Sequence, residues 1–512
     1  MSPSAEMDPR LEAEAASPAE PGPQEPTSPA AEPAIAPRAV PWFLLVAAVA
    51  FLAPLRAGVG PIRDIDTYWH LLVGQDILAG IPVTEAGRGW SFAPVADTWV
   101  SGQWLVETGF AAAVDHLGLR GLVVYRVLVL AASLVVLAMV TLRHRALRAG
   151  VLGFTIGALA LTITLQERSQ QVSFLLAPLV GWWALRLWRE GRLPRWYVVL
   201  PLVVVWANAH GGWVILPLTL AVACLARLVD HGWRDRAWRT GLLLAIGAVA
   251  AAAVSPSGLD NVLAVRRFSA SAGMIVEWQA VALTDWTTLP LALTFLAVIL
   301  TWARARIRPT WGEIVLVGSL LAFGTIAWRN VAPAVLLLSP IVVTLLSRLL
   351  GEQDPVPEPR TWRPWSRASI AAGAIGTALG LLLALTQPAV PDSVPSSLLA
   401  RLRDATAPQR VLDTYNISGP LLWFGGRPPH VLVAIDGRAD RYGADYIERY
   451  QGGLLNARPG WQSLYDELRP TAALLGKDEA LVGALVAEKG WVEVARDGGY
   501  VLLRAPDAPG WS

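Results

Sequence analysis

Two aspartates separated by one residue, Asp64 and Asp66, follow directly on the first apolar stretch of the chain. Carboxylates at this spacing can share the proton of a hydroxyl group, or they can bind a divalent cation such as Mg²⁺ or Mn²⁺ through their oxygens. In most proteins such a pair does no more than solvate the surface. Here Trp69 and His70 stand close behind the pair. Because an aromatic face and a titratable ring lie beside the acids, we predict that this segment is reactive.

Further polar residues are predicted to lie at the same membrane surface as the aspartates. They occur between apolar runs and comprise Trp104, Glu107, Glu167, Arg168, His210, Glu277 and Arg329. Ionisable groups at membrane depth are costly and usually face a cavity or one another. The planar fork of Arg329 suits a phosphate group, and the alternative is that it reaches a lipid headgroup. His210 either lines the cavity or is wetted at a helix end, and we interpret Glu167 and Arg168 as a local ion pair.

Tryptophan is abundant, with 24 residues in the chain, and many of them lie at the ends of apolar runs. Anchoring at the membrane interface explains most of these positions. Trp69, Trp99 and Trp104 are near the acidic segment, where an indole can instead stack on the apolar face of a sugar ring. The sequence leaves both interpretations open.

The composition excludes an ordinary soluble enzyme. Of the 512 residues, 54% are hydrophobic and 16% are charged, whereas a soluble domain carries about 25% charged residues. The arginines lie mostly in short loops between apolar runs, so the net charge of +2 indicates membrane topology and we predict no nucleic-acid partner. The single cysteine, Cys224, can form neither an internal disulfide nor a thiolate metal cluster.

Apolar runs near the length of about 20 residues that a helix needs to cross a membrane recur along the chain. They cover residues 40–58, 119–141, 149–165, 172–188, 196–209, 212–229, 240–255, 288–303, 311–328, 331–347 and 368–387. The fifth run, 196–209, is short for a complete crossing. We predict a polytopic α-helical membrane protein with about 11 transmembrane helices, surrounded by membrane lipids.

Arginines are concentrated in alternate loops between these runs. The rich loops contain Arg143, Arg145, Arg148, Arg186, Arg189, Arg192, Arg195, Arg227, Arg234, Arg236, Arg239, Arg304, Arg306, Arg308, Arg348, Arg360, Arg363 and Arg367. Loops rich in Lys and Arg stay on the cytoplasmic side. The intervening loops carry fewer arginines and include the acidic segment. We therefore predict a cytoplasmic N-terminus and an outer face that carries the polar motifs.

The two ends of the chain differ from its centre. Residues 1–38 are rich in Pro, Ala, Glu and Ser, which predicts a disordered cytoplasmic tail, and the transmembrane region then covers 39–390 with a first outer loop at 59–118. From 391 to 512 we predict an extracytoplasmic α/β domain, with a hairpin turn at Asp497-Gly498-Gly499. Its predicted strands are 411–415, 430–435, 472–475 and 500–503, and its predicted helices are 461–468 and 480–489.

Several segments, taken together, match a known pattern. They are Asp64-Ile65-Asp66, Trp69-His70-Leu71, Gly80-Ile81-Pro82, Ser91-Phe92, Trp104-Leu105 with Glu107, Ala207-Asn208-Ala209-His210-Gly211-Gly212, Ser255-Pro256-Ser257-Gly258, Glu277-Trp278, Arg329-Asn330 and Ile435-Asp436-Gly437-Arg438. This combination resembles the GT-C class of bacterial membrane glycosyltransferases, in the group similar to lipopolysaccharide-core galacturonosyltransferases and protein mannosyltransferases. Ser101-Gly102-Gln103 departs from the Asn-His-Glu expected before Trp104, and this departure concerns the acceptor subsite.

The resemblance implies an inverting transfer of a sugar from a polyprenyl-phosphate donor to a glycan, lipid or protein acceptor. The reaction would occur at the outer face of the bacterial plasma membrane. In such enzymes an acidic residue of the first outer loop acts as a base or helps to bind a divalent metal, and that role falls to Asp66, or otherwise to Asp64. Arg329 would hold the lipid phosphate, with His210 as a second contact. The other substrate-binding residues that the resemblance implies are Trp69, His70, Trp104, Glu107 and Glu277.

Two other classes of function compete with this hypothesis. A carrier or flippase for a lipid-linked saccharide would use the same residues for binding alone, but it should place polar features near the membrane midplane. The predicted helices are instead apolar in their middles. A non-catalytic scaffold whose outer domain binds a partner would leave the Asp64 and Asp66 segment without a role.

Overall fold

The computed structural model describes residues 40–142, 146–263, 278–282, 284–304, 308–352 and 367–511. The predicted disordered tail, 1–38, and the predicted site residue Glu277 lie outside the described residues. Five of the arginines used to assign the two membrane faces also lie outside them, namely Arg143, Arg145, Arg306, Arg360 and Arg363.

A helix is present at every range predicted to cross the membrane. These helices are α1 (Val40–Ala57), α4 (Arg120–Thr141), α5 (Leu147–Ile163), α6 (Gln170–Glu190), α7 (Trp196–Ala209), α8 (Ile215–His231), α9 (Ala237–Ala252), α11 (Leu289–Arg304), α12 (Trp311–Ile326), α13 (Val331–Leu350) and α14 (Arg367–Thr386). Short 3₁₀ turns, η1 (Gly211–Val214), η4 (Trp286–Thr288) and η5 (Trp328–Asn330), precede α8, α11 and α13.

By length and composition, 4 helical segments of the described chain suffice to cross a membrane: Arg120–Thr141, Gly211–His231, Trp286–Arg304 and Trp328–Leu350. Several others are apolar but shorter. Helix α7 has 14 residues, which corresponds to about 21 Å against a hydrocarbon core of about 30 Å. The number of about 11 crossings therefore stays a prediction, and the fifth predicted crossing is the shortest.

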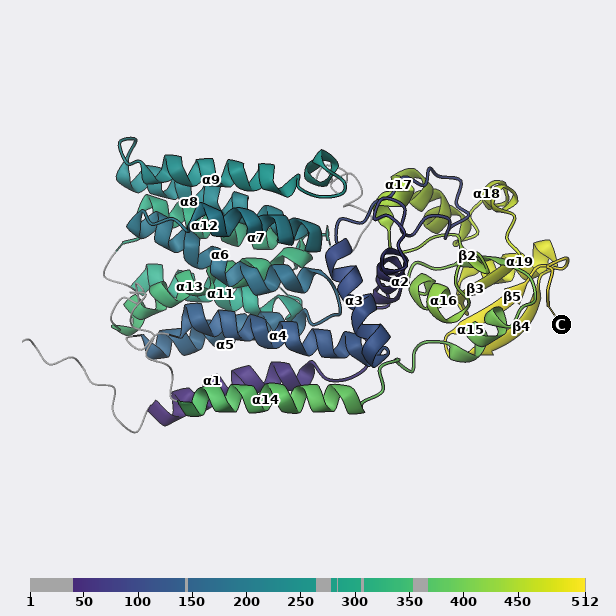
Figure 1. Cartoon of the computed structure of the whole chain (residues 1–512), viewed down its shortest axis with the longest axis horizontal. Helices are drawn as coiled ribbons and strands as arrows, with labels where there is room; N and C mark the ends of the chain where they lie inside the picture. Colours follow the sequence, from purple (N-terminus) through teal and green to yellow (C-terminus); the bar gives the residue numbers. More distant parts are fainter. Residues whose placement is uncertain are drawn as a thin grey trace, which may run out of the picture. The chain divides into compact units, whose positions relative to one another are not determined.

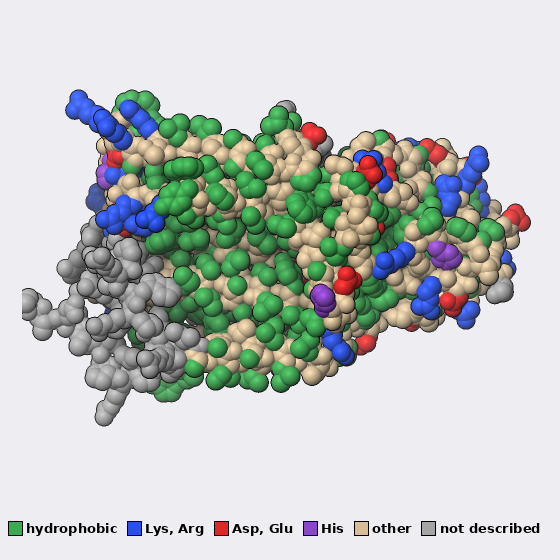
Figure 2. All heavy atoms as spheres, viewed as in Figure 1, with side chains coloured by type: hydrophobic (Ala, Val, Ile, Leu, Met, Phe, Trp, Pro, Cys, Tyr) green, Lys and Arg blue, Asp and Glu red, His purple; other side chains and the backbone are tan. Residues whose placement is uncertain are grey.

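Helix α13 is the centre of the helical bundle, and every residue from Val331 to Ser347 is buried. Its neighbours are α5, α6, α11 and α12. Close approach depends on small residues, because a Cβ atom at Gly181 of α6 would lie 2.0 Å from the Leu337 carbonyl oxygen of α13. Figure 2 shows hydrophobic side chains over the sides of the bundle, whereas Lys and Arg gather at the end away from the C-terminal sheet and on the C-terminal region itself.

The first outer loop contains two helices, α2 (Thr67–Leu78) and α3 (Trp104–Leu117), which lie between the bundle and the C-terminal sheet (Figure 1). They cross closely, because a Cβ atom at Gly74 would lie 1.9 Å from the Glu107 carbonyl oxygen. Helix α2 is also in close contact with α16 (Ser418–Phe424), where a Cβ atom at Gly419 would lie 2.2 Å from the Ile65 carbonyl oxygen. The segment that carries the two aspartates is thus held from both sides.

The C-terminal region forms a five-stranded sheet with helices around it. Its strands are β1 (Gln409–Asp413), β2 (Val431–Val433), β3 (Ala472–Gly476), β4 (Val492–Asp497) and β5 (Tyr500–Arg504), in the order β2-β1-β3-β5-β4. Strands β2, β1 and β3 are parallel, and β5 and β4 continue the sheet antiparallel. The helical segments are α15 (Ser396–Arg403), α16, α17 (Ala439–Ile447), the π-helix η6 (Glu448–Leu454), α18 (Trp461–Leu468) and α19 (Ala480–Lys489).

The sequence predicted much of this region correctly. The predicted helices 461–468 and 480–489 coincide with α18 and α19, and the hairpin turn before the last strand is confirmed between Asp497 and Tyr500. Helices α15, α16 and α17 were not predicted. The division of the chain at 390 and 391 stays a prediction, because the first outer loop and the C-terminal sheet are packed together.

The first outer loop joins the edge of that sheet. Ser91 forms an isolated parallel bridge with Val433 of β2. The Phe92 amide donates to the Val433 carbonyl oxygen at 3.1 Å, and the Val433 amide donates to the Trp90 carbonyl oxygen at 3.0 Å. Residues 90–92 therefore cover the exposed edge of β2, which would otherwise present unpaired backbone groups.

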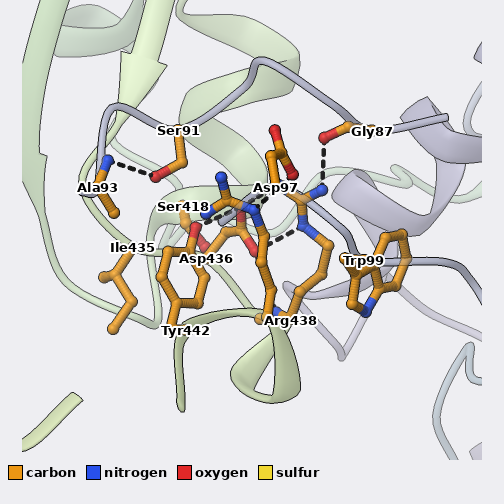
Figure 3. A network of polar contacts seen from close by, with 12 residues as sticks. Gly87, Ser91, Ala93, Asp97, Trp99, Ser418, Ile435, Asp436, Arg438 and Tyr442 are labelled. Carbon is orange, nitrogen blue, oxygen red and sulfur yellow. Dashed lines mark hydrogen bonds and ion pairs between the residues drawn. The ribbon is translucent and has the colours of Figure 1, made fainter. Parts of the chain in front are cut away.

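A buried ion pair fixes the same contact (Figure 3). Asp436 and Arg438, both fully buried, are joined at 2.6 Å, and Tyr442 donates to the same Asp436 oxygen at 2.8 Å. The Arg438 guanidinium lies between the rings of Trp90 and Trp99, at 4.9 and 5.1 Å from their centroids. It also donates to a backbone carbonyl of the first outer loop, and this contact fixes the loop on the C-terminal sheet.

We expect Arg438→Met to lower the free energy of unfolding by about 3–5 kcal/mol, because it leaves the buried Asp436 carboxylate without its cation. The double variant Asp436→Leu/Arg438→Met should lose less of its free energy of unfolding, because neither charge then remains buried without a partner. Thermal and denaturant unfolding of the purified protein in detergent measures both. Arg403→Met is the control, because Arg403 is 61% exposed in its ion pair and should contribute little. Equal stability of the single variant and the native chain would contradict this assignment.

Candidate functional site

Arg168 bridges the two aspartates of the first outer loop. It lies between α5 and α6, and its Nη2 atom is 3.1 Å from an Asp64 oxygen and 2.9 Å from Asp66 Oδ2. Its Nε atom donates to the other Asp64 oxygen. The Asp64 side chain is only 4% exposed, whereas that of Asp66 is 18% exposed. Asp64 is therefore committed to Arg168 through both oxygens, and Asp66 keeps the more accessible carboxylate.

The environment of Asp66 favours proton uptake. Burial, and then the neighbouring charge of Asp64, raise the pKa of Asp66 to about 6, against the opposing effects of Arg168 and His70. At neutral pH the carboxylate is mostly ionised, yet its proton affinity is close to the working pH. A pKa in this range suits a general base.

Glu167 and Arg168 reach different partners, so their interpretation as a local ion pair was wrong. Glu167 pairs with Arg126 of α4, and both side chains are fully buried. Glu167 also accepts the backbone N–H of Arg63 at 3.0 Å. Arg126 in turn donates to the Gly58 carbonyl oxygen at 2.7 Å. Adjacent residues of one short loop thereby hold the start of the first outer loop and its acidic pair.

His70 belongs to a second chain of polar contacts. Its Nδ1 atom is 2.7 Å from Glu107 Oε1, and both residues are buried. Gln103 lies 3.1 Å from the same imidazole nitrogen and accepts a hydrogen bond from Ser169, the residue that precedes α6. Glu107 Oε2 has no hydrogen-bond partner within the described part of the chain. The predicted pair of substrate contacts, His70 and Glu107, thus interact with each other, and one carboxylate oxygen stays available.

His210, at the end of α7, is held as a neutral imidazole. Its Nδ1 atom lies 2.7 Å from the Ser173 hydroxyl and accepts the Gly212 N–H at 3.0 Å. Burial, and then the charges of Arg329 and Arg168, lower the pKa of His210 to about 3. Since Nδ1 accepts both hydrogen bonds, the ring proton is on Nε2. His210 can therefore donate a hydrogen bond but carries no charge at neutral pH.

Arg329 lies in η5, at the start of the central helix α13. Its guanidinium is 4.5 Å from the centre of the Trp278 ring. Its charge also acts on His210, so the predicted motifs around Trp278, Arg329 and His210 converge. Glu277, the neighbour of Trp278, cannot be placed because it lies outside the described residues.

The three tryptophans proposed as sugar platforms have structural contacts. Trp69 is 4% exposed and lies edge-on to Trp99, with 6.0 Å between ring centroids. Trp104 is half-buried and donates to Asn208 Oδ1 at 2.7 Å, which ties α3 to α7. Neither contact was predicted from the sequence, because the indoles read equally well as interfacial anchors.

The predicted site residues that the structure describes thus gather at one end of the helical bundle. Sequence reasoning did not find the contacts of Gln103, which lies in the first outer loop itself, or those of Arg168, Ser169 and Ser173, which come from the α5–α6 loop and from α6. Asp64 and Asp66 are the candidates for binding a divalent cation, but Arg168 already lies between them. No group of three or more His, Cys, Asp or Glu side chains is placed to hold a metal within the residues that the structure describes.

Comparison of the sequence with protein-family models and with curated proteins finds no match. The structure is similar to that of the Archaeoglobus fulgidus oligosaccharyltransferase tethered with an acceptor peptide, with a TM-score of 0.50 and 12% identity over 85% of this chain and 69% of that chain. The chain has a GT-C fold. This confirms the fold expected from the sequence motifs, whereas the finer subgroup stays a prediction.

Two further solved structures are similar to this chain at lower scores. One is ArnT from Cupriavidus metallidurans bound to undecaprenyl phosphate, with a TM-score of 0.47 and 14% identity over 93% of this chain and 100% of that chain. The other is the arabinofuranosyltransferase AftD from Mycobacteria, with a TM-score of 0.43 and 15% identity over 92% of this chain and 40% of that chain.

Replacement of Arg168 tests its role between the carboxylates. Arg168→Gln removes the counter-ion and raises the pKa of Asp66 in the folded protein further above its unfolded value. The resulting loss of stability is small when Asp66 is protonated and grows as the pH rises. We expect a loss of roughly 3 kcal/mol at pH 8, near the lower end for a broken buried pair, and less at pH 5.

Unfolding temperatures at both pH values measure this difference. Arg88→Gln is the matched control, because Arg88 is an exposed arginine of the same outer loop. A loss that is equal at pH 5 and pH 8 would contradict an ionic role for Arg168.

Proposed function

We propose that this chain is a membrane glycosyltransferase that transfers a sugar from a polyprenyl-phosphate donor to an acceptor hydroxyl. The observation that carries the proposal is the position of Asp66, a partly accessible carboxylate with a pKa of about 6, at the end of the bundle where Arg329 and His210 also meet. A transferase of this kind needs a base for the acceptor and a cation for the leaving phosphate, and this region supplies both.

The proposed reaction is a single displacement. Asp66 accepts the proton of the acceptor hydroxyl while that oxygen forms a bond to the anomeric carbon of the sugar. The bond between this carbon and the lipid-phosphate oxygen breaks, and its electron pair stays on the phosphate. Attack from the face opposite the leaving group inverts the anomeric configuration. Arg329 stabilises the negative charge that develops on the phosphate, and neutral His210 donates a hydrogen bond from Nε2.

Asp64 has a supporting role in this proposal. Both of its oxygens are bound to Arg168, so it orients the guanidinium that in turn contacts Asp66. A divalent cation at the acidic pair would have to displace Arg168. We therefore propose that Arg168 takes the place of the Mg²⁺ or Mn²⁺ that the sequence allowed, and that transfer continues in the presence of EDTA.

The proposed location is the outer face of a bacterial plasma membrane. The observations that support it are the concentration of arginines in alternate loops and the Lys and Arg side chains at the end of the bundle away from the C-terminal sheet (Figure 2). In this orientation the N-terminus is cytoplasmic and the C-terminal sheet is extracytoplasmic. The acceptor is a glycan, a lipid or a protein that is available on that side.

The central test is a transfer assay with purified protein and a panel of polyprenyl-phosphate sugars. We expect Asp66→Asn to lower kcat by about 10²–10⁴-fold, the typical contribution of a general base. Asp64→Asn should be less severe, because its effect passes through Arg168. Asp115→Asn, an exposed carboxylate at the end of α3, is the control and should keep the native rate.

Native turnover in both Asp66→Asn and Asp64→Asn would exclude this pair from the chemistry. If no donor were consumed while labelled lipid crossed the bilayer, the protein would be a carrier. If neither occurred, the scaffold hypothesis would remain. Loss of native turnover in EDTA, restored by Mg²⁺ or Mn²⁺, would contradict the role given to Arg168.

The pH dependence of kcat/KM gives an independent test of the base. Because the ionised form of Asp66 is the active one, kcat/KM should rise through a pKa of about 6 and level off above it. An ordinary exposed aspartate would give a limb near pH 4. In Arg168→Gln the rise in kcat/KM should occur at higher pH, because the cation that favours the ionised Asp66 carboxylate is gone. A limb that is identical in native and Arg168→Gln protein would show that another group titrates.

A further inference from the structure

The loop that follows β2, Asp436-Gly437-Arg438, lies directly against the proposed base. A Cβ atom placed on Gly437 would be 2.7 Å from Asp66 Oδ1 and 2.2 Å from Trp69 Nε1. Both distances are shorter than any ordinary contact of a side chain. The φ angle of Gly437 lies outside the left-handed region that favours glycine, so glycine is required here for space and not for backbone conformation.

The Gly437 peptide is fixed on the C-terminal side. The Tyr415 hydroxyl donates to the Gly437 carbonyl oxygen at 3.0 Å. The next residue, Arg438, donates its backbone N–H to Asp436 at 3.0 Å and its guanidinium to the same carboxylate (Figure 3). Because Asp436 and Arg438 are fully buried, the loop cannot move aside without breaking their ion pair.

The other partner of this contact is fixed as well. Asp66 and Trp69 belong to the first turn of α2, which is in close contact with α16. Within this packing the Tyr68 ring lies 5.3 Å from the Phe424 ring, edge to face. The Trp69 indole is buried, and its hydrogen bond to Asp66 helps to lower the pKa of that carboxyl group, so the indole and the carboxylate lie together at Gly437. Two rigid elements therefore meet at one glycine.

We propose that the C-terminal sheet region forms a wall of the active site and that Gly437 sets the position of the Asp66 carboxylate. Gly437 is a positioning residue: its lack of a side chain leaves the space that Asp66 occupies beside Arg168. This inference rests on the proposed function, because it assigns Asp66 as the base. By this proposal the region after β2 contributes to the reaction itself and is not a separate binding module.

Gly437→Ala is the direct test. The added methyl group must displace Asp66 or Trp69, and a shift of about 1 Å at a reacting group can reduce turnover by about 10²-fold. We expect kcat to fall between about 10-fold and 100-fold while KM for the polyprenyl-phosphate donor stays within about twofold, because Arg329 and His210 are untouched. A general loss of structure would instead lower the unfolding temperature and the fraction of folded protein.

Gly453→Ala is the matched control, since a Cβ atom there meets nothing within 4 Å and the residue lies in the same region of the chain. It should keep native kcat and native stability. Native kcat in Gly437→Ala would overturn the proposal. So would a fall in kcat that is matched by an equal loss of folded protein.

A cross-link tests the contact without any assay of activity. The chain has 1 cysteine, Cys224, so a Cys224→Ser background allows unambiguous pairing. We expect Asp66→Cys with Gly437→Cys to form an intramolecular disulfide on mild oxidation, detected by mass spectrometry of the proteolysed protein. Asp66→Cys with Gly453→Cys should form none. If the disulfide between Asp66→Cys and Gly437→Cys does not form, the proposal that the C-terminal sheet region forms a wall of the active site is overturned. If it forms but the native chain transfers no sugar, only the proposed function is overturned.

Discussion

The loop between α5 and α6 carries two opposite charges at adjacent positions, Glu167 fully buried and Arg168 21% exposed, and this end of the bundle is organised around them. Glu167 pairs with the guanidinium of Arg126 and accepts a backbone N–H of the first outer loop. Arg168 pairs with the carboxylates of Asp64 and Asp66. Buried charges are tolerated only when they are paired. Each of these groups therefore fixes its partner, and the pairing places an acidic loop on top of an apolar bundle.

A second constraint acts from the C-terminal side. The parallel strands β1 and β2 end close to the first outer loop, and residues 90–92 of that loop complete the sheet edge. Arg438 lies between two tryptophans of the loop, so the ion pair with Asp436 is shielded from water. The aspartates thus sit between two polar anchors, one in the bundle and one in the sheet. This arrangement explains how a loop that is long in sequence can hold a carboxylate in one position.

The sequence predicted those features that repeat a simple pattern. Apolar length located the membrane helices, amphipathic stretches located α18 and α19, and Asp497-Gly498-Gly499 located the last hairpin. Helices α15 to α17, of 7 to 9 residues, were not predicted. Two of them lack a regular helical pattern, because α16 begins Ser418-Gly419-Pro420 and Gly443 inside α17 has a non-helical conformation. Asp64 and Asp66 stood out through their spacing, but their counter-ion did not. Arg168 is adjacent to Glu167 in sequence, and only the turn between two helices directs the two side chains to different partners.

Ser91, which completes the edge of β2, also donates through its hydroxyl to the Ala434 carbonyl oxygen, 343 positions further along the chain. The first outer loop precedes most of the helices in the chain and β2 follows them, so during synthesis the loop is made long before its partner strand. Until β2 and Arg438 are made, the loop has an open edge and Trp90 and Trp99 lack the guanidinium that lies against them. The contact between the loop and the C-terminal sheet therefore forms only after the helical bundle has been synthesised.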